Sequence, residues 1–260
     1  MGPGHGSAPG GIGGFSPEAF KTLAEVEADS FWFRSRNKLI LFLIKKYFPF
    51  FESFLEVGCG TGFVLHGLES AFPQARFYGS ELFIEGLFFA RKRLPAVEFY
   101  QMDATRMPFC ESFDLIGSFD VLEHIENDEA ALQSMYEALV PGGGLLVSVP
   151  QHAWLWSNTD VQACHVRRYS AAELHAKLTK AGFHIVRSLS FVSILLPLMV
   201  ASRLFKCNKS KQKEEAELTI PNWLNIIFEK ALTFERGLIR AGVNLPCGGS
   251  RFVVACKPKR

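Results

Sequence analysis

The sequence lacks the features that mark a nucleic-acid binder, a secreted protein or a zinc ribbon. Its 28 basic and 26 acidic residues leave a net charge of only +2, whereas nucleic-acid-binding domains usually carry a strong basic excess. No basic stretch followed by an apolar stretch opens the chain, so we expect no secretory signal. The six cysteines form no C-x-x-C pair. We therefore expect free thiols, a cytoplasmic location and no nucleic-acid partner.

The sequence also has little that could cross a membrane. One apolar run, residues 194–205, is shorter than the roughly 20 residues that span a bilayer, and Pro197 interrupts it. Lysines follow the run, as in polybasic anchors, and glutamates then dilute their charge: Lys206, Lys209, Lys211, Lys213, Glu214, Glu215 and Glu217. Two interpretations of this region stay open. It is either a helical pair that buries its own apolar face, or an interfacial element that makes peripheral membrane contact through residues 192–213.

The chain is long enough for one large domain with an elaboration. Residues 1–14 hold seven glycines and two prolines, which predicts a disordered leader over residues 1–15 and a single domain over residues 16–260. An N-terminal helix is expected over residues 16–47, with Ser16 as its N-cap. A helical insertion, residues 192–250, separates the last two expected strands and is far longer than a hairpin loop.

Short apolar segments alternate with longer helical segments through most of the domain. This alternation predicts an α/β fold with a doubly wound, mostly parallel sheet that has helices on both faces. Seven strands are expected, over residues 54–57, 76–79, 97–101, 113–118, 144–149, 183–191 and 250–257. Sheets of this kind bind ligands at the carboxyl ends of their strands, so we expect the site just after Val57, Gly79, Gln101 and Ser118.

The loop after the first strand carries three glycines on alternate positions, Gly58, Gly60 and Gly62. The dinucleotide pattern G-x-G-x-x-G would need glycine where Phe63 stands. Glu56 at the end of the strand would repel a phosphate and attract a cation. Alternating glycines remove the side chains from one edge of the turn, so a flat, neutral nucleoside could lie against the backbone.

Two further acids follow the next strands. Glu81 stands 19 residues after Gly62, a distance that suits a carboxylate accepting from both hydroxyls of a ribose. Asp103 follows the third strand and could accept from an exocyclic amine of adenine. Together with Glu56, these residues indicate a cationic adenosine compound with a free amino group and no phosphates.

Five segments in order resemble the motifs of class I S-adenosylmethionine-dependent methyltransferases: EVGCGTG, GSEL, MDATRMPF, FDLIGSFDVLEHI and LVPGGGLLVSVP. They cover residues 54–150, and the most similar branch includes the ubiquinone-biosynthesis O-methyltransferases. The resemblance implies a Rossmann-like methyltransferase fold and S-adenosylmethionine as the cofactor. The cofactor-binding residues that we predict are Glu56, Gly58, Cys59, Gly60, Gly62, Glu81, Leu82, Asp103, Ala104, Phe119 and Asp120.

The acceptor side is less defined by motifs. His165, and after it His124, are the candidate general bases, because the ordinary pKa of histidine is near 6.5. Candidate substrate contacts are Trp32, Arg36, His152, Trp154, Arg168 and Tyr169, with Trp32 as a wall and Arg36 facing a substrate anion. No metal site is predicted, since the spacing of His152, Asp160 and His165 matches no metal-binding pattern.

We therefore expect a methyltransferase that acts on an oxygen of a hydrophobic or lipid-linked small molecule. Two alternatives stay open: an NAD-dependent oxidoreductase, and a non-catalytic module that kept the cofactor-binding fold. The sequence names neither the acceptor nor the oligomeric state.

Overall fold

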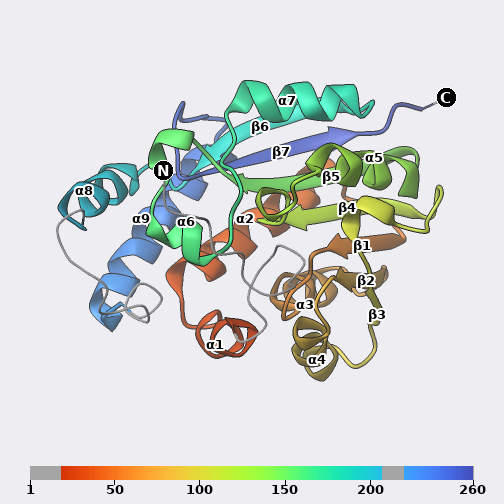
Figure 1. Ribbon diagram of the computed structural model, residues 1–260, viewed down its shortest axis with the longest axis horizontal. Helices are drawn as coiled ribbons and strands as arrows, with labels where there is room; N and C mark the ends of the chain where they lie inside the picture. Colours follow the sequence, from red (N-terminus) through yellow and green to blue (C-terminus); the bar gives the residue numbers. More distant parts are fainter. Residues whose placement is uncertain (1–18, 207–219, 260) are drawn as a thin grey trace, which may run out of the picture.

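A single seven-stranded sheet organises the described residues, which are 19–206 and 220–259 of the computed structural model (Figure 1). The strand order is β3-β2-β1-β4-β5-β7-β6. Neighbouring strands pair in parallel except β7, which runs antiparallel to β5 and β6. The strands are β1 (Ser53–Val57), β2 (Arg76–Glu81), β3 (Glu98–Gln101), β4 (Phe113–Phe119), β5 (Leu139–Pro150), β6 (His184–Phe191) and β7 (Ser250–Cys256). The predicted fold class is confirmed.

The chain order reverses beside β1, and this reversal places the site. The chain runs outward from β1 to β2 and β3, then returns to lay β4 on the other side of β1. Val57 at the end of β1 pairs with Ser80 of β2 and with Ser118 of β4. The residues that follow these three positions therefore meet at one edge of the sheet, where ligands of such folds bind.

The two faces of the sheet carry separate apolar layers. On β1, Phe54 joins the layer under α2 (Phe31–Tyr47), α3 (Phe63–Ala71) and α4 (Ile84–Arg93), whereas Leu55 joins the layer under α5 (Asp128–Ala138) and α7 (Ala171–Lys180). Leu146 and Leu145 of β5 divide in the same way. Successive side chains of a strand point to opposite faces, so this alternation anchors the helices on both sides.

The N-terminal helix is broken, which contradicts the prediction of one helix over residues 16–47. The described part holds α1 (Ala19–Val26) and α2, with a turn between them. Asn225 of α9 (Asn222–Arg240) binds this turn: its Oδ1 accepts from the Phe31 N–H at 2.7 Å and its Nδ2 donates to the Asp29 carbonyl at 2.5 Å. These bonds satisfy the backbone that the break leaves open. Ser16 and the predicted leader lie outside the described residues.

Other predicted elements differ mainly at their ends. Strand β2 continues to Glu81, and β5 begins at Leu139, which pairs with Phe113. The polar stretch after β5 folds into short turns: η3 (Ala153–Leu155) and α6 (Asn158–Gln162). Two more 3-10 turns follow β3 and β4: η1 (Ala104–Arg106) and η2 (Leu122–His124).

The insertion is helical in its described parts and is anchored to α2. It contains α8 (Leu196–Lys206) and α9. Glu229 of α9 pairs with Arg34 at 2.6 Å and with Lys38 at 2.9 Å, both from α2. Glu235, fully buried, accepts from the Ser193 N–H at 2.9 Å. None of the helices within residues 19–206 and 220–259 combines the length and apolar character that a membrane span needs.

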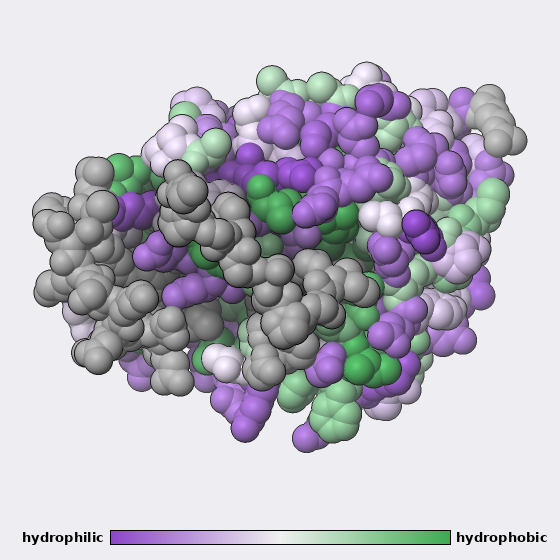
Figure 2. Space-filling view, in the orientation of Figure 1, coloured by the Kyte–Doolittle hydropathy of each residue, from purple (hydrophilic) through white to green (hydrophobic). Residues whose placement is uncertain are grey.

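The surface is uneven in polarity. On the face drawn in Figure 2, hydrophilic residues prevail over α7, while hydrophobic residues form a patch over α4. Ile84 and Phe88 of α4 are among the exposed large apolar residues. A second group of exposed apolar residues lies on α8 and α9 and comprises Leu198, Trp223, Ile226, Ile227 and Phe234.

Candidate active site

The glycine loop between β1 and α3 needs glycine for steric reasons. Gly58, Gly60 and Gly62 have φ angles of +72°, +52° and +76°, in the region that side chains other than glycine rarely adopt. A Cβ on Gly58 would lie 2.4 Å from Cγ2 of Val121. The loop therefore packs against the chain that follows β4. Burial raises the pKa of the Cys59 thiol well above its ordinary value, which makes this side chain a small filler of the loop.

Glu81 ties this loop to the end of β2. One carboxyl oxygen accepts from the Gly60 N–H at 3.0 Å, and the other accepts from the N–H groups of Leu82 and Phe83 at 2.8 and 3.3 Å. The sequence predicted that Glu81 and the glycines share one site, and the structure brings them into direct contact. Since a carboxylate has about four lone-pair positions, Glu81 can accept further hydrogen bonds.

Glu56 is buried on β1 with no hydrogen-bond partner for its Oε2 among the described residues. Burial raises the pKa of this carboxyl to about 8, because the nearby charge of Arg36 only partly offsets the loss of water. A ligand cation at this point would favour the ionised carboxylate. The residue thus fits the ammonium of an amino-acid group.

The remaining predicted cofactor residues differ in exposure. Asp103 is exposed after β3, and its Oδ1 accepts from the N–H and the hydroxyl of Thr105, both at 2.8 Å. Ala104 begins the η1 turn, and the Leu82 carbonyl accepts from Gln101 at 3.1 Å. The Phe119 side chain is 4% exposed and packs in the apolar layer under α2. Contacts of these residues with a cofactor stay a prediction.

Asp120 and Arg36 join the end of β4 to α2. Asp120 has a φ of +57° and forms an ion pair with Arg36. The Arg36 guanidinium also lies 4.5 Å from the centre of the Trp32 ring, a cation–π contact. Arg36 was predicted to face a substrate anion; the structure gives it the carboxylate of Asp120 as a partner. Helix α2 is therefore joined to the end of β4 through Arg36.

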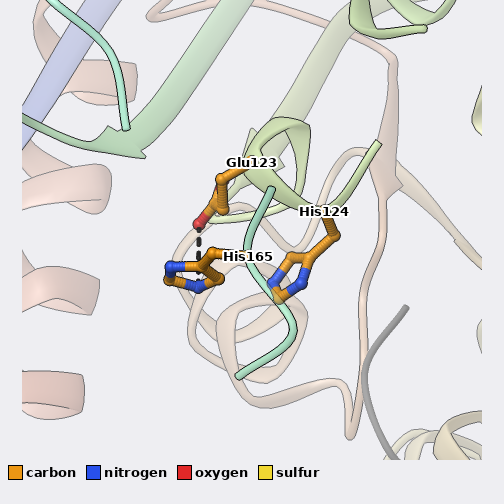
Figure 3. A group of neighbouring side chains, drawn as sticks. All are labelled: Glu123, His124 and His165. Atoms are coloured by element: carbon orange, nitrogen blue, oxygen red, sulfur yellow. Dashed lines mark ion pairs between the residues drawn. The ribbon is translucent and has the colours of Figure 1, made fainter. Parts of the chain in front are cut away.

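Beyond Asp120, three side chains from two distant segments meet: Glu123, His124 and His165 (Figure 3). The Nε2 atom of His165 lies 3.9 Å from Oε1 of Glu123, and the two imidazole rings lie 4.7 Å apart, edge to face. Glu123 is fully buried, and burial together with the charge of Asp120 raises its pKa well above the ordinary value. Burial, aided by His165, lowers the pKa of His124 to about 4, so this imidazole is neutral at pH 7.

Asp160 orients His165 from behind. This fully buried carboxylate accepts from His165 Nδ1 at 2.9 Å and from Arg168 Nε at 2.6 Å. Burial alone would raise the pKa of Asp160, but the hydrogen bonds from His165 and Arg168 outweigh it and lower the pKa. Asp160 thus fixes the orientation of the His165 ring, with Nε2 directed toward Glu123.

The HVRRY segment divides between two anchors. His165 and Arg168 bind Asp160, whereas Arg167 and Tyr169 bind Asp128 of α5 at 2.8 and 2.6 Å. Tyr169 is fully buried, so the prediction that it contacts the substrate does not fit its position in the core. Its role is to fix the path of the segment that carries His165.

His152 and Trp154 lie apart from the histidine cluster. His152 stacks on Trp154 with ring centres 5.2 Å apart, and Trp154 is exposed. Within the described residues, the one group of three or more potential metal ligands is Glu123, His124 and His165. The triple of His152, Asp160 and His165 that the sequence analysis considered is thus not assembled. Sequence spacing gave no signal for Glu123, because its partner His165 lies 42 residues away, beyond α5 and β5.

Sequence reasoning also missed how α1 contacts the glycine loop. Glu27, at the end of α1, is buried and accepts from the Thr61 hydroxyl at 2.7 Å. Its other oxygen pairs with Arg93 of α4 at 2.5 Å. These contacts add a second anchor for the loop beside that of Glu81. An isolated glutamate before a turn carries no recognisable pattern.

Comparison with known proteins agrees with this geometry. Residues 54–143 match the family described as methyltransferase domain. A probable S-adenosylmethionine-dependent methyltransferase of Mycolicibacterium smegmatis is 27% identical over 169 residues, which cover 64% of each chain. A trans-aconitate 2-methyltransferase of Variovorax paradoxus is 32% identical over 99 residues, 38% of each chain. The chain thus spans less than two thirds of the length of these relatives.

Solved structures share the fold. A chain from the complex of the Haloferax volcanii Trm112 methyltransferase activator with a methyltransferase superposes with a TM-score of 0.62 at 17% identity, covering 92% of this chain and 97% of that one. Phosphoethanolamine N-methyltransferase 2 of Haemonchus contortus, solved with S-adenosyl-L-methionine, gives 0.58 at 21% identity, covering 84% and 52%. Over its matched domain the chain is thus similar to S-adenosylmethionine-dependent methyltransferases, and its sheet has the fold of solved methyltransferase structures.

Proposed function

We propose that the protein transfers a methyl group from S-adenosylmethionine to an acceptor that binds beside His165. One observation carries the proposal. The glycine loop, held by Glu81, and the buried carboxyl of Glu56 lie at the same sheet edge as the cluster of Glu123, His124 and His165. Arg36, which lies near both Glu56 and Glu123, links the two groups.

The residues of the cofactor side would hold and orient the cofactor. Glu56 would accept from the ligand ammonium, Glu81 from the ribose hydroxyls, and Asp103 from the adenine amine, while the glycines let the nucleoside approach the backbone. When bound, S-adenosylmethionine supplies a methyl group on a positively charged sulfur. That sulfur is the leaving group and needs no further activation. Alignment of the acceptor with that methyl group is then the main task of the protein, and such positioning can contribute about 7–11 kcal/mol.

An acceptor hydroxyl must also lose its proton. The cluster of Glu123, His124 and His165 is the place where we expect this step, because Asp160 holds His165 with Nε2 facing the cluster. The sequence analysis predicted His165, and after it His124, as the residues of this step. Both belong to the cluster, and their catalytic roles remain part of the proposal.

We further propose that the acceptor is hydrophobic or lipid-linked and is methylated on oxygen, as in the ubiquinone-biosynthesis branch. The exposed apolar residues of α9 support this. Trp223, Ile226, Ile227 and Phe234 recur at the spacing of one helix face. Since α9 packs on α2, which contacts the site through Arg36, this face would bring the site to a membrane surface that holds the acceptor.

Thermal unfolding with S-adenosylhomocysteine, with NAD and without ligand tests the cofactor part. A bound ligand raises the melting temperature in proportion to the logarithm of its concentration over its dissociation constant. We expect a rise with S-adenosylhomocysteine alone. A rise with NAD alone would favour the oxidoreductase alternative. Incubation with labelled S-adenosylmethionine and a membrane-lipid extract then separates an active enzyme, which labels a product, from a non-catalytic module, which labels none.

A further inference from the structure

Glu123 differs from two other carboxylates near the histidine cluster, Asp120 and Asp160. Asp120 is paired with Arg36, and Asp160 is paired with Arg168. Glu123 is fully buried, and neither of its carboxyl oxygens has a hydrogen-bond partner among the described residues. A buried carboxylate without such partners is costly, and proteins normally supply a cation or donors for it. Apart from the His165 ring 3.9 Å away, the described residues offer this carboxyl no partner, so the position can take a cation from outside the chain.

The neighbours of Glu123 restrict what that cation can be. Its carboxylate and the imidazoles of His124 and His165 each offer one ligand atom, and these atoms lie within 4.8 Å of one another. Two imidazoles and one carboxylate form the ligand set of many catalytic zinc sites and of other divalent transition metals. Around such an ion, ligand atoms at about 2.0–2.2 Å would stand about 3–4 Å apart, so the three side chains need only draw inward.

The surroundings of His165 fit the same role. A histidine that binds a metal almost always donates its other ring N–H to a carboxylate or a carbonyl, which fixes its orientation. His165 has this arrangement, since Nδ1 donates to Asp160 at 2.9 Å. Arg168 in turn holds Asp160 at 2.6 Å and the Gln151 carbonyl at 3.2 Å. The second ring nitrogen of His165 is thereby directed at Glu123 (Figure 3).

We propose that Glu123, His124 and His165 bind a divalent transition-metal ion, with Zn²⁺ as the best-fitting probe, and that the remaining position on the ion takes the acceptor oxygen. The second part rests on the proposed methyltransferase function. A hydroxyl on the ion loses its proton to solvent more easily than a free hydroxyl. Its oxygen then bonds to the methyl carbon as the carbon–sulfur bond breaks, and the bonding electrons stay on sulfur. His165 is a ligand in this arrangement, and Asp160 positions it.

Metal binding to the full chain tests the site without any activity measurement. The protein is stripped with a chelator, dialysed, and titrated calorimetrically with Zn²⁺, Co²⁺ and Mg²⁺. We expect one Zn²⁺ per chain and much weaker Mg²⁺ binding, because Mg²⁺ prefers oxygen ligands. Glu123→Gln and His165→Ala should each weaken Zn²⁺ binding by about 100-fold or more, and Asp160→Asn by about 10- to 100-fold.

Two histidines outside the cluster provide matched controls. His66 is exposed on α3, and His175 on α7 bonds to Ser188. His66→Ala and His175→Ala should leave Zn²⁺ affinity unchanged, and far-ultraviolet circular dichroism checks that every variant is folded. Absence of a stoichiometric Zn²⁺ or Co²⁺ site in the folded wild-type protein would overturn the proposal. So would equal Zn²⁺ affinity in wild type, Glu123→Gln and Asp160→Asn.

The same preparation separates this proposal from the proposed function. If S-adenosylhomocysteine raises the melting temperature and Zn²⁺ does not bind, the metal site is wrong and the methyltransferase proposal stands. If Zn²⁺ binds at Glu123 and S-adenosylhomocysteine has no effect, the metal site stands and its assignment to methyl transfer fails.

Discussion

The residues proposed to bind the cofactor and the cluster proposed to bind the acceptor are held by different kinds of contact. In the first group, Glu81 joins the end of β2 to the glycine loop by accepting from three backbone N–H groups. On the acceptor side, side chains from separate segments are joined by charge: Arg36 with Asp120, and His165 and Arg168 with Asp160. The glycine loop should therefore be sensitive to any added side-chain volume, and the acceptor cluster to the loss of single charged side chains.

The largest effect is expected from Gly58→Ala. The new Cβ would lie 2.4 Å from Val121 Cγ2, at a φ of +72° that alanine avoids. Overpacking and backbone strain together should lower the free energy of unfolding by about 2–4 kcal/mol and abolish binding of S-adenosylhomocysteine. Urea unfolding and calorimetry measure the two effects.

Gly242→Ala is the matched control for Gly58→Ala. Gly242 has a φ of +92°, but a Cβ there would meet no atom within 4 Å. Gly242→Ala should therefore lower the free energy of unfolding only through backbone strain, by about 1 kcal/mol. Adding Val121→Ala to Gly58→Ala should recover part of the lost stability. Equal losses at positions 58 and 242 would show that the glycine loop is not limited by contact with Val121.

The second-largest effect is expected in His165→Ala, which should lose turnover. Whether His165 serves as a metal ligand or accepts the proton itself, its removal should lower kcat by about 10²- to 10⁴-fold. Because the glycine loop and Glu81 are untouched, the dissociation constant of S-adenosylhomocysteine should stay within about twofold of wild type. His175→Ala should change neither quantity. Unchanged turnover in His165→Ala would remove this residue from the mechanism.

The same contrast explains what the sequence could predict. Each of the seven predicted strand ranges overlaps an observed strand, and the glycines, Glu81 and Asp103 follow successive strands as expected. All of this depends on local features: apolar periodicity, turn residues and the rule that strand ends share an edge. The strands of the sheet and the residues that follow them could therefore be predicted from short stretches of sequence.

The acceptor side could not be derived in this way. The meeting of His165 with Glu123 depends on the path of residues 151–169, which Tyr169 and Arg167 fix by binding Asp128 on α5. The break before α2 depends on Asn225, which lies 194 residues after Phe31. Contacts this distant in sequence leave no periodic pattern, so only the folded structure reveals them.

A third prediction concerns Glu56, whose pKa is raised from 4.5 to about 8. The folded state binds this proton more tightly than the unfolded state, so the stability it contributes is lost as pH rises through the window from 4.5 to about 8. Between pH 6 and pH 8 the loss should be about 2–3 kcal/mol in the wild type. The glutamine in Glu56→Gln cannot titrate, so the free energy of unfolding of this variant should fall less between pH 6 and pH 8. Urea unfolding at both pH values measures the difference.

Ligand binding sharpens the Glu56 prediction. S-adenosylhomocysteine carries an ammonium group, whereas 5′-methylthioadenosine lacks the amino-acid part. If Glu56 accepts from the ammonium, the affinity for S-adenosylhomocysteine should rise more between pH 6 and pH 8 than the affinity for 5′-methylthioadenosine. Glu56→Gln should abolish that difference. Parallel pH profiles for both ligands in the wild type would place Glu56 away from the amino group.

The smallest effect is expected where α9 of the insertion meets α2, away from the residues proposed to bind cofactor and acceptor. Hydrogen bonds from Arg34 and Lys38 hold the pKa of Glu229 at about 2. A depressed carboxyl pKa adds stability above the unfolded value of 4.5 that disappears as pH falls toward 2. Because the pair is partly exposed, Glu229→Gln should cost only about 0.5 kcal/mol at pH 7 and nothing near pH 2. Arg34→Met, which keeps the apolar stem, should cost a similar amount, and neither variant should change S-adenosylhomocysteine affinity. A loss of S-adenosylhomocysteine affinity in Glu229→Gln would instead mean that α9 influences the cofactor-binding residues through α2, since Arg34 and Arg36 lie on the same helix.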